Sequence, residues 1–337
     1  MPPLLIRACS TAEIPLNSVK RVAVAQKYLA VYNIDGAFYA TDDECTHAAA
    51  SLADGLLEGD IIECSMVRTM RRIIAGGEIG ELAMIATFNY TNYLYRPRRP
   101  EELDTGQGGG IMFNQVPHQI DVIRLLGGGR LRSVRAQVSA LDPARPTEGS
   151  CVAFLAFESG ASASLVYSGY DFFDSDELHF WVSEGGAPKC PGTHGAARRA
   201  LAARVAAETQ LRIDTYAYRE ASGAPAPHQP HFGVTIATCA RGELRASRDG
   251  VIVYDESGSR EVPLRRGPGA PGRVEVLDDM RAALRTGRRP VHDGRWGKAS
   301  VETALAMLRS SREGREVTLE HQVPVPTTAG GASERDY

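Results

Sequence analysis

The chain has 337 residues, enough for two domains of ordinary size or one large α/β domain with a substantial core. Hydrophobic residues make up 43% and charged residues 23%, with 34 Gly and 19 Pro, so collagen-like, coiled-coil and disordered chains are excluded. The 38 basic and 41 acidic residues leave a net charge of −3, which argues against nucleic acid as the main partner.

Targeting signals and membrane spans are not predicted. No run approaches the 18 apolar residues of a membrane-spanning helix, and the N-terminal MPPLLIRACS lacks the basic-then-apolar order of a signal peptide. We therefore expect a cytoplasmic protein without a membrane partner. Six scattered cysteines do not form a disulfide scaffold, so they are either buried small side chains or metal ligands.

The first sixty residues predict strands and turns, and the rest predicts strands and helices in separate runs. Strands at 18–25, 28–33 and 37–41, with a turn at Gly36, indicate a small antiparallel unit. A helix ending at Gly76 and Gly77 leads into the remaining elements, which favour an α+β second part. We predict further strands at 82–90, 131–141, 151–157 and 161–167, helices at 110–126, 194–210, 273–285 and 297–313, and a disordered tail at 326–337.

The first chemical pattern is Cys45-Thr46-His47, followed by Cys64 after 16 intervening residues. Thiolate and imidazole ligands at this spacing could hold an iron centre. Chance is the alternative, because about 0.14 Cys-x-His triplets are expected from 6 Cys and 8 His in this length.

These residues stand in a longer pattern, VYNIDGAFYATDDECTHAAASLADGLLEGDIIEC, preceded by LIRACSTAEIP. Residues 1–64 thereby resemble the front of a Rieske-type ferredoxin of ring-hydroxylating dioxygenase systems. The resemblance implies a 2Fe-2S cluster with Cys45, His47 and Cys64 as ligands. The family's second histidine ligand would stand at position 67, where this chain has Val67, which offers no lone pair, and the family's later cluster-covering loops are missing.

The second pattern follows the glycines at 108–110, where Asn114, His118 and Asp121 would share one stripe of a helix. A histidine there could take a hydroxyl proton while a hydride leaves the same carbon. The alternatives are a solvated helix face or a core histidine bonded to Asp121. The triple glycine lacks the spacing of a dinucleotide fingerprint.

GGGIMFNQVPHQIDVIRLLGGG, with PVHDGRWGKASVETALAML near the end, resembles the C-terminal part of the Gfo/Idh/MocA oxidoreductases. The likeness covers Arg68 to Val325 and is nearest to dehydrogenases of phthalate-type cis-dihydrodiols. It implies an open-faced β-sheet with helices that carries the substrate site and commonly packs on another subunit, and an N-terminal Rossmann domain for NAD(P). His118 would be the proton acceptor and Asn114, in place of the usual Asp, a substrate-orienting neighbour.

Other positions could contact a substrate. Arg98, with its neighbours Arg96 and Arg99, could bind a carboxylate through bidentate bonds or lie in a solvated loop. Three further residues could line a pocket for a ring, namely His179, Trp181 and His231.

The family's nucleotide domain has no counterpart before Arg68, so we expect a fusion with no complete Rossmann domain. We predict a truncated ferredoxin-like domain at 1–66 and a substrate domain at 68–325. The function expected is an impaired cis-dihydrodiol dehydrogenase acting on a small aromatic-derived carboxylate or diol. The alternatives are a Rieske electron carrier that serves dioxygenase components, and a non-catalytic binding or oligomer-forming shell.

Overall fold

The computed structural model describes residues 8–15, 18–24, 27–34, 36–42, 65–203, 227–264 and 292–326, with 283, 285–287 and 290. The chain forms two compact units. The first comprises residues 1–60 with 212–223, and the second comprises residues 61–211 with 224–337. No helix among the described residues is long and apolar enough to cross a membrane.

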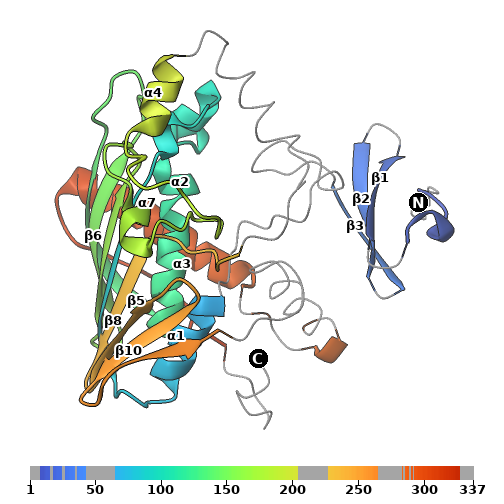
Figure 1. Ribbon diagram of the computed structural model, residues 1–337. Helices are drawn as coiled ribbons and strands as arrows, with labels where there is room; N and C mark the ends of the chain where they lie inside the picture. The colour runs from blue at the N-terminus through green and yellow to red at the C-terminus, as the bar shows by residue number, and fades with distance from the viewer. Residues whose placement is uncertain are drawn as a thin grey trace. The chain divides into compact units, whose positions relative to one another are not determined.

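The first unit contains a three-stranded antiparallel sheet, which confirms the predicted strand–turn–strand pattern (Figure 1). Gly36, with φ +87°, makes the tight connection that a side chain would strain. A small core of Ile14, Val22 and Val31 joins the sheet to the preceding turn, and the Asn33 amide donates to the Ile14 carbonyl at 2.8 Å. The strands are β1 (Ser18–Val24), β2 (Lys27–Ile34) and β3 (Ala37–Asp42), with the 3₁₀ turn η1 (Thr11–Glu13) before them.

The second unit is built on a nine-stranded sheet in the order β11-β10-β9-β8-β4-β7-β6-β5-β12. Among the described strands, β4 and β7 are the only parallel neighbours, so the sheet is mixed. The strands are β4 (Leu82–Tyr90), β5 (Leu131–Ser139), β6 (Ser150–Phe157), β7 (Ser162–Ser168), β8 (Val234–Cys239), β9 (Gly242–Ala246), β10 (Gly250–Asp255), β11 (Gly258–Pro263) and β12 (Val317–Thr318).

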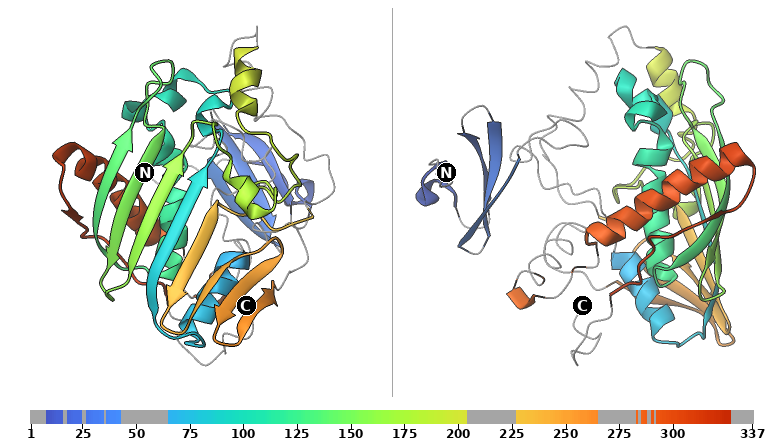
Figure 2. Two further views of the ribbon diagram at one scale, coloured as in Figure 1. Left: turned by 60° about the vertical axis from the view of Figure 1, so that its left-hand side comes forward. Right: turned by 180° about the vertical axis from the view of Figure 1, so that it is seen from behind.

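Helices cover one face of this sheet, as both views in Figure 2 show. Helix α3 places fully buried Ile120 and Ile123 in the main core, and α7 crosses it and packs on β5. The helices of this unit are α1 (Ser65–Ala75), α2 (Ile111–Asn114), α3 (Val116–Leu126), α4 (Ala196–Ala202) and α7 (Gly294–Glu313). Short 3₁₀ turns connect them, namely η2 (Tyr93–Tyr95), η3 (Pro100–Leu103), η4 (Thr105–Gln107) and η5 (Ser175–His179).

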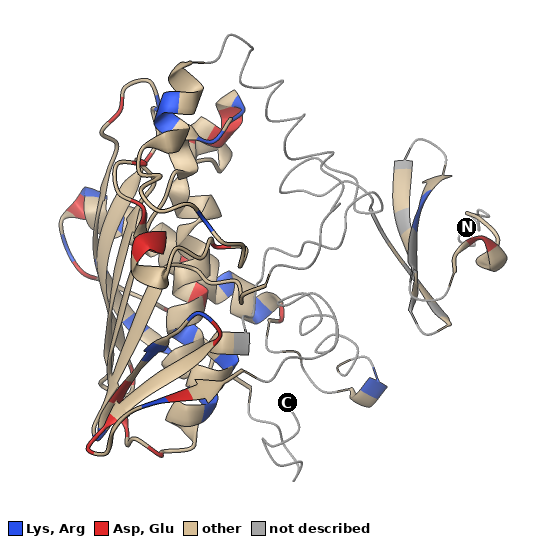
Figure 3. Cartoon of the chain, in the orientation of Figure 1, with Lys and Arg blue, Asp and Glu red and all other residues tan. Residues whose placement is uncertain are grey.

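The other face of the sheet is open, in agreement with the expected open-faced architecture. Along β6 the buried Cys151 alternates with Val152 and Phe154, which are 51% and 53% exposed. Strands β4, β6, β7 and β8 contain no charged residue and are uniformly tan in Figure 3. Alternating residues of β6 therefore serve the core and an apolar surface.

The prediction of one helix over 110–126 is wrong in one respect, because the structure has two helices there, α2 and α3, which meet at Gln115. Pro117 explains the break, since its ring clashes with the carbonyl of Phe113 in a continuous helix and it has no N–H to donate. The predicted helix at 297–313 begins earlier, at Gly294, where Asp293 caps it. The helix predicted at 194–210 is α4 in its described part, and the one at 273–285 lies almost entirely outside the described residues.

Buried polar bonds join α3 to α7. The Arg124 side chain is fully buried and stacks on the Trp296 ring, with its guanidinium carbon 3.8 Å from the ring centroid. Its Nη1 donates to the Trp296 carbonyl at 2.9 Å and to Ser300 Oγ at 2.8 Å. One turn earlier, the Asp121 carboxylate accepts from Trp296 Nε1 and lies 3.0 Å from His292 Nε2. Asp121 thus bonds to Trp296 of α7.

Candidate functional site

The three glycines at 108–110 form a tight turn in front of α2. Gly108 and Gly110 have φ +81° and +77°, which side chains rarely adopt. A Cβ on Gly109 would lie 2.5 Å from the Glu101 carbonyl oxygen, and one on Gly110 would lie 2.2 Å from Thr147 Oγ1. The glycines are therefore required by packing and backbone conformation.

Asn114 closes this turn. Its Nδ2 donates to the Gly110 carbonyl at 2.9 Å and lies 3.4 Å from the Gly108 carbonyl. An amide can make these bonds because it is a donor, whereas a carboxylate has no hydrogen to give. The position of Asn114 thus gives a physical reason for its departure from the acidic residue of the resembled family.

We expect Asn114→Asp to destabilise the turn. The carboxylate would face the Gly110 carbonyl as a second acceptor, and the lost bond and repulsion should lower the free energy of unfolding by about 1–3 kcal/mol. Urea denaturation measures this change. Asn114→Ser, which keeps a donor, is the control, and an N114D protein as stable as the wild type would contradict the assigned role.

His118 lies at the start of α3, one turn beyond Asn114, and faces an aromatic pair. Its ring centroid is 4.9 Å from that of Phe232, and Phe232 stacks on Tyr167 at 6.4 Å with an 18° interplanar angle. Tyr167 is fully buried, and burial raises its pKa well above the ordinary value. The imidazole is half-buried against ring surfaces, a setting suited to a flat substrate.

The Tyr167 hydroxyl connects this pair to the helix break. It donates to Gln115 Oε1 at 3.2 Å, and it is 2.7 Å from Thr91 Oγ1. Thr91 Oγ1 also accepts from the Tyr93 backbone N–H at 3.1 Å. The bond to Gln115 fixes the residue directly before α3, three positions before His118.

A second polar group lies at the end of β4. Arg96 Nη2 is 3.0 Å from Glu184 Oε2, and Arg96 Nε donates to Asn92 Oδ1 at 2.6 Å. Asn89 Nδ2 donates to the other Glu184 oxygen at 3.1 Å. Burial opposes ionisation of Glu184, but Arg96 and Asn89 outweigh it and hold its pKa below the usual value. Asn89 is paired with Tyr167 across β4 and β7 and is bonded to Glu184, so this group adjoins the Tyr167 side of the His118 region.

Arg98, predicted as a carboxylate ligand, is only 5% exposed. Its Nε donates to the Tyr93 carbonyl at 3.0 Å, its guanidinium stacks on the Tyr93 ring, and Nη1 is 3.2 Å from Glu102. These contacts hold the loop that carries Arg96. Contact of Arg98 with a substrate stays a prediction, and the less buried Arg96 is the better placed of the two.

The structure brings together His179 and His231, two of the residues predicted to line a pocket, with ring centroids 3.7 Å apart. His231 Nε2 donates to the Val182 carbonyl at 2.8 Å, which leaves Nδ1 as an acceptor that has no partner among the described residues. Asp176 Oδ1 is 3.6 Å from His231 Nε2, and Lys189 joins Asp176 to Asp174. The two imidazoles therefore lie beside a charged group formed by Asp174, Asp176 and Lys189.

The buried His179 predicts a pH-dependent stability. Burial, followed by the charges of His231 and nearby arginines, lowers its pKa to about 3. The unfolded chain takes up this proton near pH 6.5 and the folded chain does not, so stability is complete above pH 6.5 and falls as the pH drops toward 3. We expect a loss of about 2 kcal/mol between pH 6.5 and 5 by urea denaturation, and a flatter profile for His179→Gln. The exposed His321→Gln is the control, and an unchanged profile in H179Q would refute the assignment.

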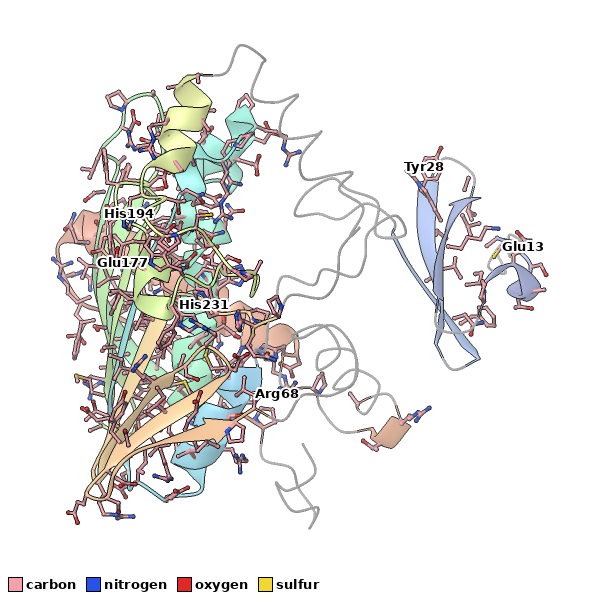
Figure 4. The ribbon with its side chains drawn as sticks, viewed as in Figure 1. Glu13, Tyr28, Arg68, Glu177, His194 and His231 are labelled. Carbon is pink, nitrogen blue, oxygen red and sulfur yellow. The ribbon has the colours of Figure 1, made fainter. Side chains whose placement is uncertain are left out.

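Trp181 lies in the same segment, next to His194, with ring centroids 5.3 Å apart. His194 Nε2 is 2.8 Å from Glu177, and Figure 4 shows these two labelled side chains together, with His231 in the same unit. Phe180 and Trp181 have φ +60° and +52°, an unusual conformation for two consecutive aromatic residues. Such strain marks a segment held by its surroundings and is typical of functional sites.

The predicted metal ligands Cys45, His47 and Cys64 lie outside the described residues. Val67 is described and belongs to helix α1, where it is 3% exposed. Within the described ranges, no three His, Cys, Asp or Glu residues are grouped as a metal site.

One Gly-x-Gly-x-x-Gly spacing escaped the sequence reasoning, at Gly267, Gly269 and Gly272, beyond the described residues. Its intervening residues include Pro268 and Pro271, which have no N–H to offer a pyrophosphate. The spacing therefore fits a dinucleotide-binding turn poorly. Sequence reasoning also missed side chains that join the site from distant parts of the chain, namely Asn89, Tyr167, Glu184 and Phe232.

Two protein families match different parts of the chain. Residues 67–187 match the GFO/IDH/MocA C-terminal domain, and residues 5–67 match the Rieske [2Fe-2S] domain. The Rieske match supports an iron–sulfur cofactor class.

One curated relative matches most of the chain, and others match only its N-terminal part. A 1-carboxy-3-chloro-3,4-dihydroxycyclohexa-1,5-diene dehydrogenase of Comamonas testosteroni is 33% identical over 316 residues, covering 89% of this chain and 75% of the relative. The ferredoxin component of a naphthalene 1,2-dioxygenase system of Pseudomonas aeruginosa is 49% identical over 61 residues. That match covers 18% of this chain, which spans 59% of the ferredoxin.

The crystal structure of a protein from Bordetella bronchiseptica RB50 described as a dehydrogenase is 49% identical, with a TM-score of 0.73. The similarity covers 76% of this chain and 67% of that one. Together with the open sheet, the helix bearing His118 and the Comamonas relative, this similarity assigns the larger part of the molecule. The chain belongs to the Gfo/Idh/MocA oxidoreductase family and carries a Rieske-type segment at its N-terminus.

Proposed function

We propose that the larger unit is the substrate domain of a dehydrogenase for carboxylated cis-dihydrodiols of aromatic compounds. The observation that carries the proposal is the half-buried His118 on α3, facing the Phe232–Tyr167 stack beside the Arg96–Glu184 pair. The name of the Comamonas relative, a carboxylated dihydroxycyclohexadiene dehydrogenase, supports this substrate class.

Each task of the reaction is assigned to a different group of residues. The Phe232 ring, backed by the buried Tyr167, offers an apolar wall to the substrate ring, and Arg96, directly after η2, offers charge to its carboxylate. His118 accepts the proton of the hydroxyl that is oxidised. A bound NAD(P) would supply the hydride acceptor.

We further propose that turnover by this chain is impaired, because residues before Arg68 resemble a ferredoxin rather than a nucleotide-binding domain. The test is calorimetric titration with a carboxylated cis-dihydrodiol, alongside NAD(P)H formation followed by absorbance. We expect binding of the diol with little nucleotide reduction. Undetectable binding of the diol would contradict the substrate assignment, and rapid reduction of NAD(P)+ would contradict the impairment.

Carboxylate recognition predicts a charge-selective effect of Arg96. The double variant Arg96→Gln/Glu184→Gln removes both charges, so no carboxylate is left unpaired. We expect the carboxylated diol to bind to it at least tenfold more weakly, which corresponds to about 1.4 kcal/mol of binding free energy. The same ring without its carboxylate should bind equally to the variant and the wild type. Equal weakening of both ligands would show that the pair only maintains the fold.

The alternative function, electron transfer to a dioxygenase, rests on the Rieske-type segment and its ferredoxin relatives. We propose that it is lost, because Val67 stands where the resembled family has its second histidine. Self-association through the exposed Val152 and Phe154 of the open face is compatible with either function and is measured by light scattering.

A further inference from the structure

We propose that position 67, where the resembled family has its second histidine ligand, is part of the core of the dehydrogenase-like unit in this chain. As a result, this chain does not assemble a Rieske cluster, and a histidine at position 67 does not restore one. The inference concerns the N-terminal segment and does not depend on the dihydrodiol chemistry proposed above.

The donor set is the first argument. A Rieske centre binds its two irons through two cysteines and two histidines. The match to that family ends at Val67, and the resemblance supplies Cys45, His47 and Cys64 before it. A valine side chain has no lone pair, so one iron would have a single protein ligand. A metal site needs its full ligand count to offset the cost of ordering its loops.

The placement of Val67 is the second argument. Helix α1 begins at Ser65, immediately after Cys64, and its Met66, Val67 and Met70 are at most 3% exposed. They belong to the same core cluster as the buried residues of α3 and of the large sheet. Helix α1 packs on α3, β9 and β10. Position 67 is therefore an interior position of the second unit.

This helix cannot readily turn Val67 toward a ligand outside the core. Val67, Met70 and Ile73 recur every three residues and lie on one side of α1, so rotating one side chain out withdraws the others. Each such side chain contributes roughly 1.5–3 kcal/mol when buried. Arg71 Nη1 also donates to the Leu125 carbonyl at 2.7 Å and fixes α1 against the end of α3.

The family boundaries coincide with this packing. The Rieske match covers residues 5–67 and the GFO/IDH/MocA match covers residues 67–187, so both matches include Val67. The structure resolves this overlap in favour of the dehydrogenase-like unit, because the side chain is buried in that unit's core. A point substitution changes the residue but leaves its location in the core unchanged.

The test is anaerobic reconstitution of the full chain with ferrous iron and sulfide, followed by measurement of iron, acid-labile sulfide and visible absorption. We compare the wild type with Val67→His and with Val67→Asn, a polar control that does not supply an imidazole. We expect all three to hold far less than the two irons and two sulfides of a complete cluster. Both variants should also melt at a lower temperature than the wild type, because each buries a polar group in an apolar core.

Two results would overturn the inference. A complete cluster in the wild type would mean that another residue supplies the fourth ligand. A complete cluster in V67H but not in V67N would mean that position 67 reaches the cluster and is not held in the core. If V67H does not fold, the wild-type measurement still decides the first point. Iron content is independent of diol binding, so failure here is distinguishable from failure of the proposed function.

Discussion

Gly110→Ala is expected to lower the free energy of unfolding by about 3 kcal/mol, because two separate costs fall on one residue. The backbone at Gly110 has φ +77°, and an added Cβ would lie 2.2 Å from Thr147 Oγ1. Relief of the contact would move the start of α2, to which Asn114 is bonded, and with it the approach to His118. Urea denaturation and diol titration of G110A measure the two effects.

The neighbouring glycines are matched controls that separate the two costs. Gly108 has φ +81° with open space at its Cβ position, so Gly108→Ala should cost about 1 kcal/mol from backbone strain alone. Gly109 has no positive φ but would place a Cβ 2.5 Å from the Glu101 carbonyl oxygen, so its Ala variant reports the steric cost. Equal stability of the G108A and G110A proteins would refute the contact with Thr147.

The second large effect is expected for Arg124→Ala, which should cost about 3–5 kcal/mol. The substitution removes the stack on Trp296 and leaves the Trp296 carbonyl and Ser300 Oγ without their charged donor. Burial lowers the pKa of Arg124 to about 10, because the charged form is disfavoured away from water. Thermal and chemical denaturation measure the loss.

Arg130→Ala is the matched control for Arg124. The Arg130–Glu158 ion pair is 3.4 Å long with both side chains 53% exposed, so its loss should change stability by less than about 1 kcal/mol. A comparable loss in the two variants would mean that the buried contacts of Arg124 contribute no more than a surface ion pair.

Local signals in the sequence predicted much of the fold. Alternating residues and Gly36 identified the first sheet, and the paired glycines after Ile74 identified the end of α1. The break between α2 and α3 was missed because hydrophobic spacing continues across it, although Pro117 carries the signal. Strands β8 to β11 were not predicted, although β8 and β10 contain the β-branched residues that are typical of strands.

The candidate site shows the same limit. His118 and Asn114 could be identified because they lie four residues apart in one motif. Phe232 and Tyr167 could not be identified, since β7 and the segment before β8 come close to His118 only through the order of strands in the sheet. Arg98 was favoured over Arg96 because a sequence does not show which of two arginines stacks on Tyr93 and bonds within its own loop.

The position of β4 in the sheet has a consequence for how the protein is made. Its partners β7 and β8 are both later in the chain, and β8 begins about 140 residues after β4 ends. At ordinary rates of synthesis, the central strand emerges on the order of ten seconds before its second neighbour exists. During that interval β4, which has no charged side chain, has unpaired backbone edges that are open to association between nascent chains. Yield in a host should therefore depend on chaperones that bind the growing polypeptide before β8 leaves the ribosome.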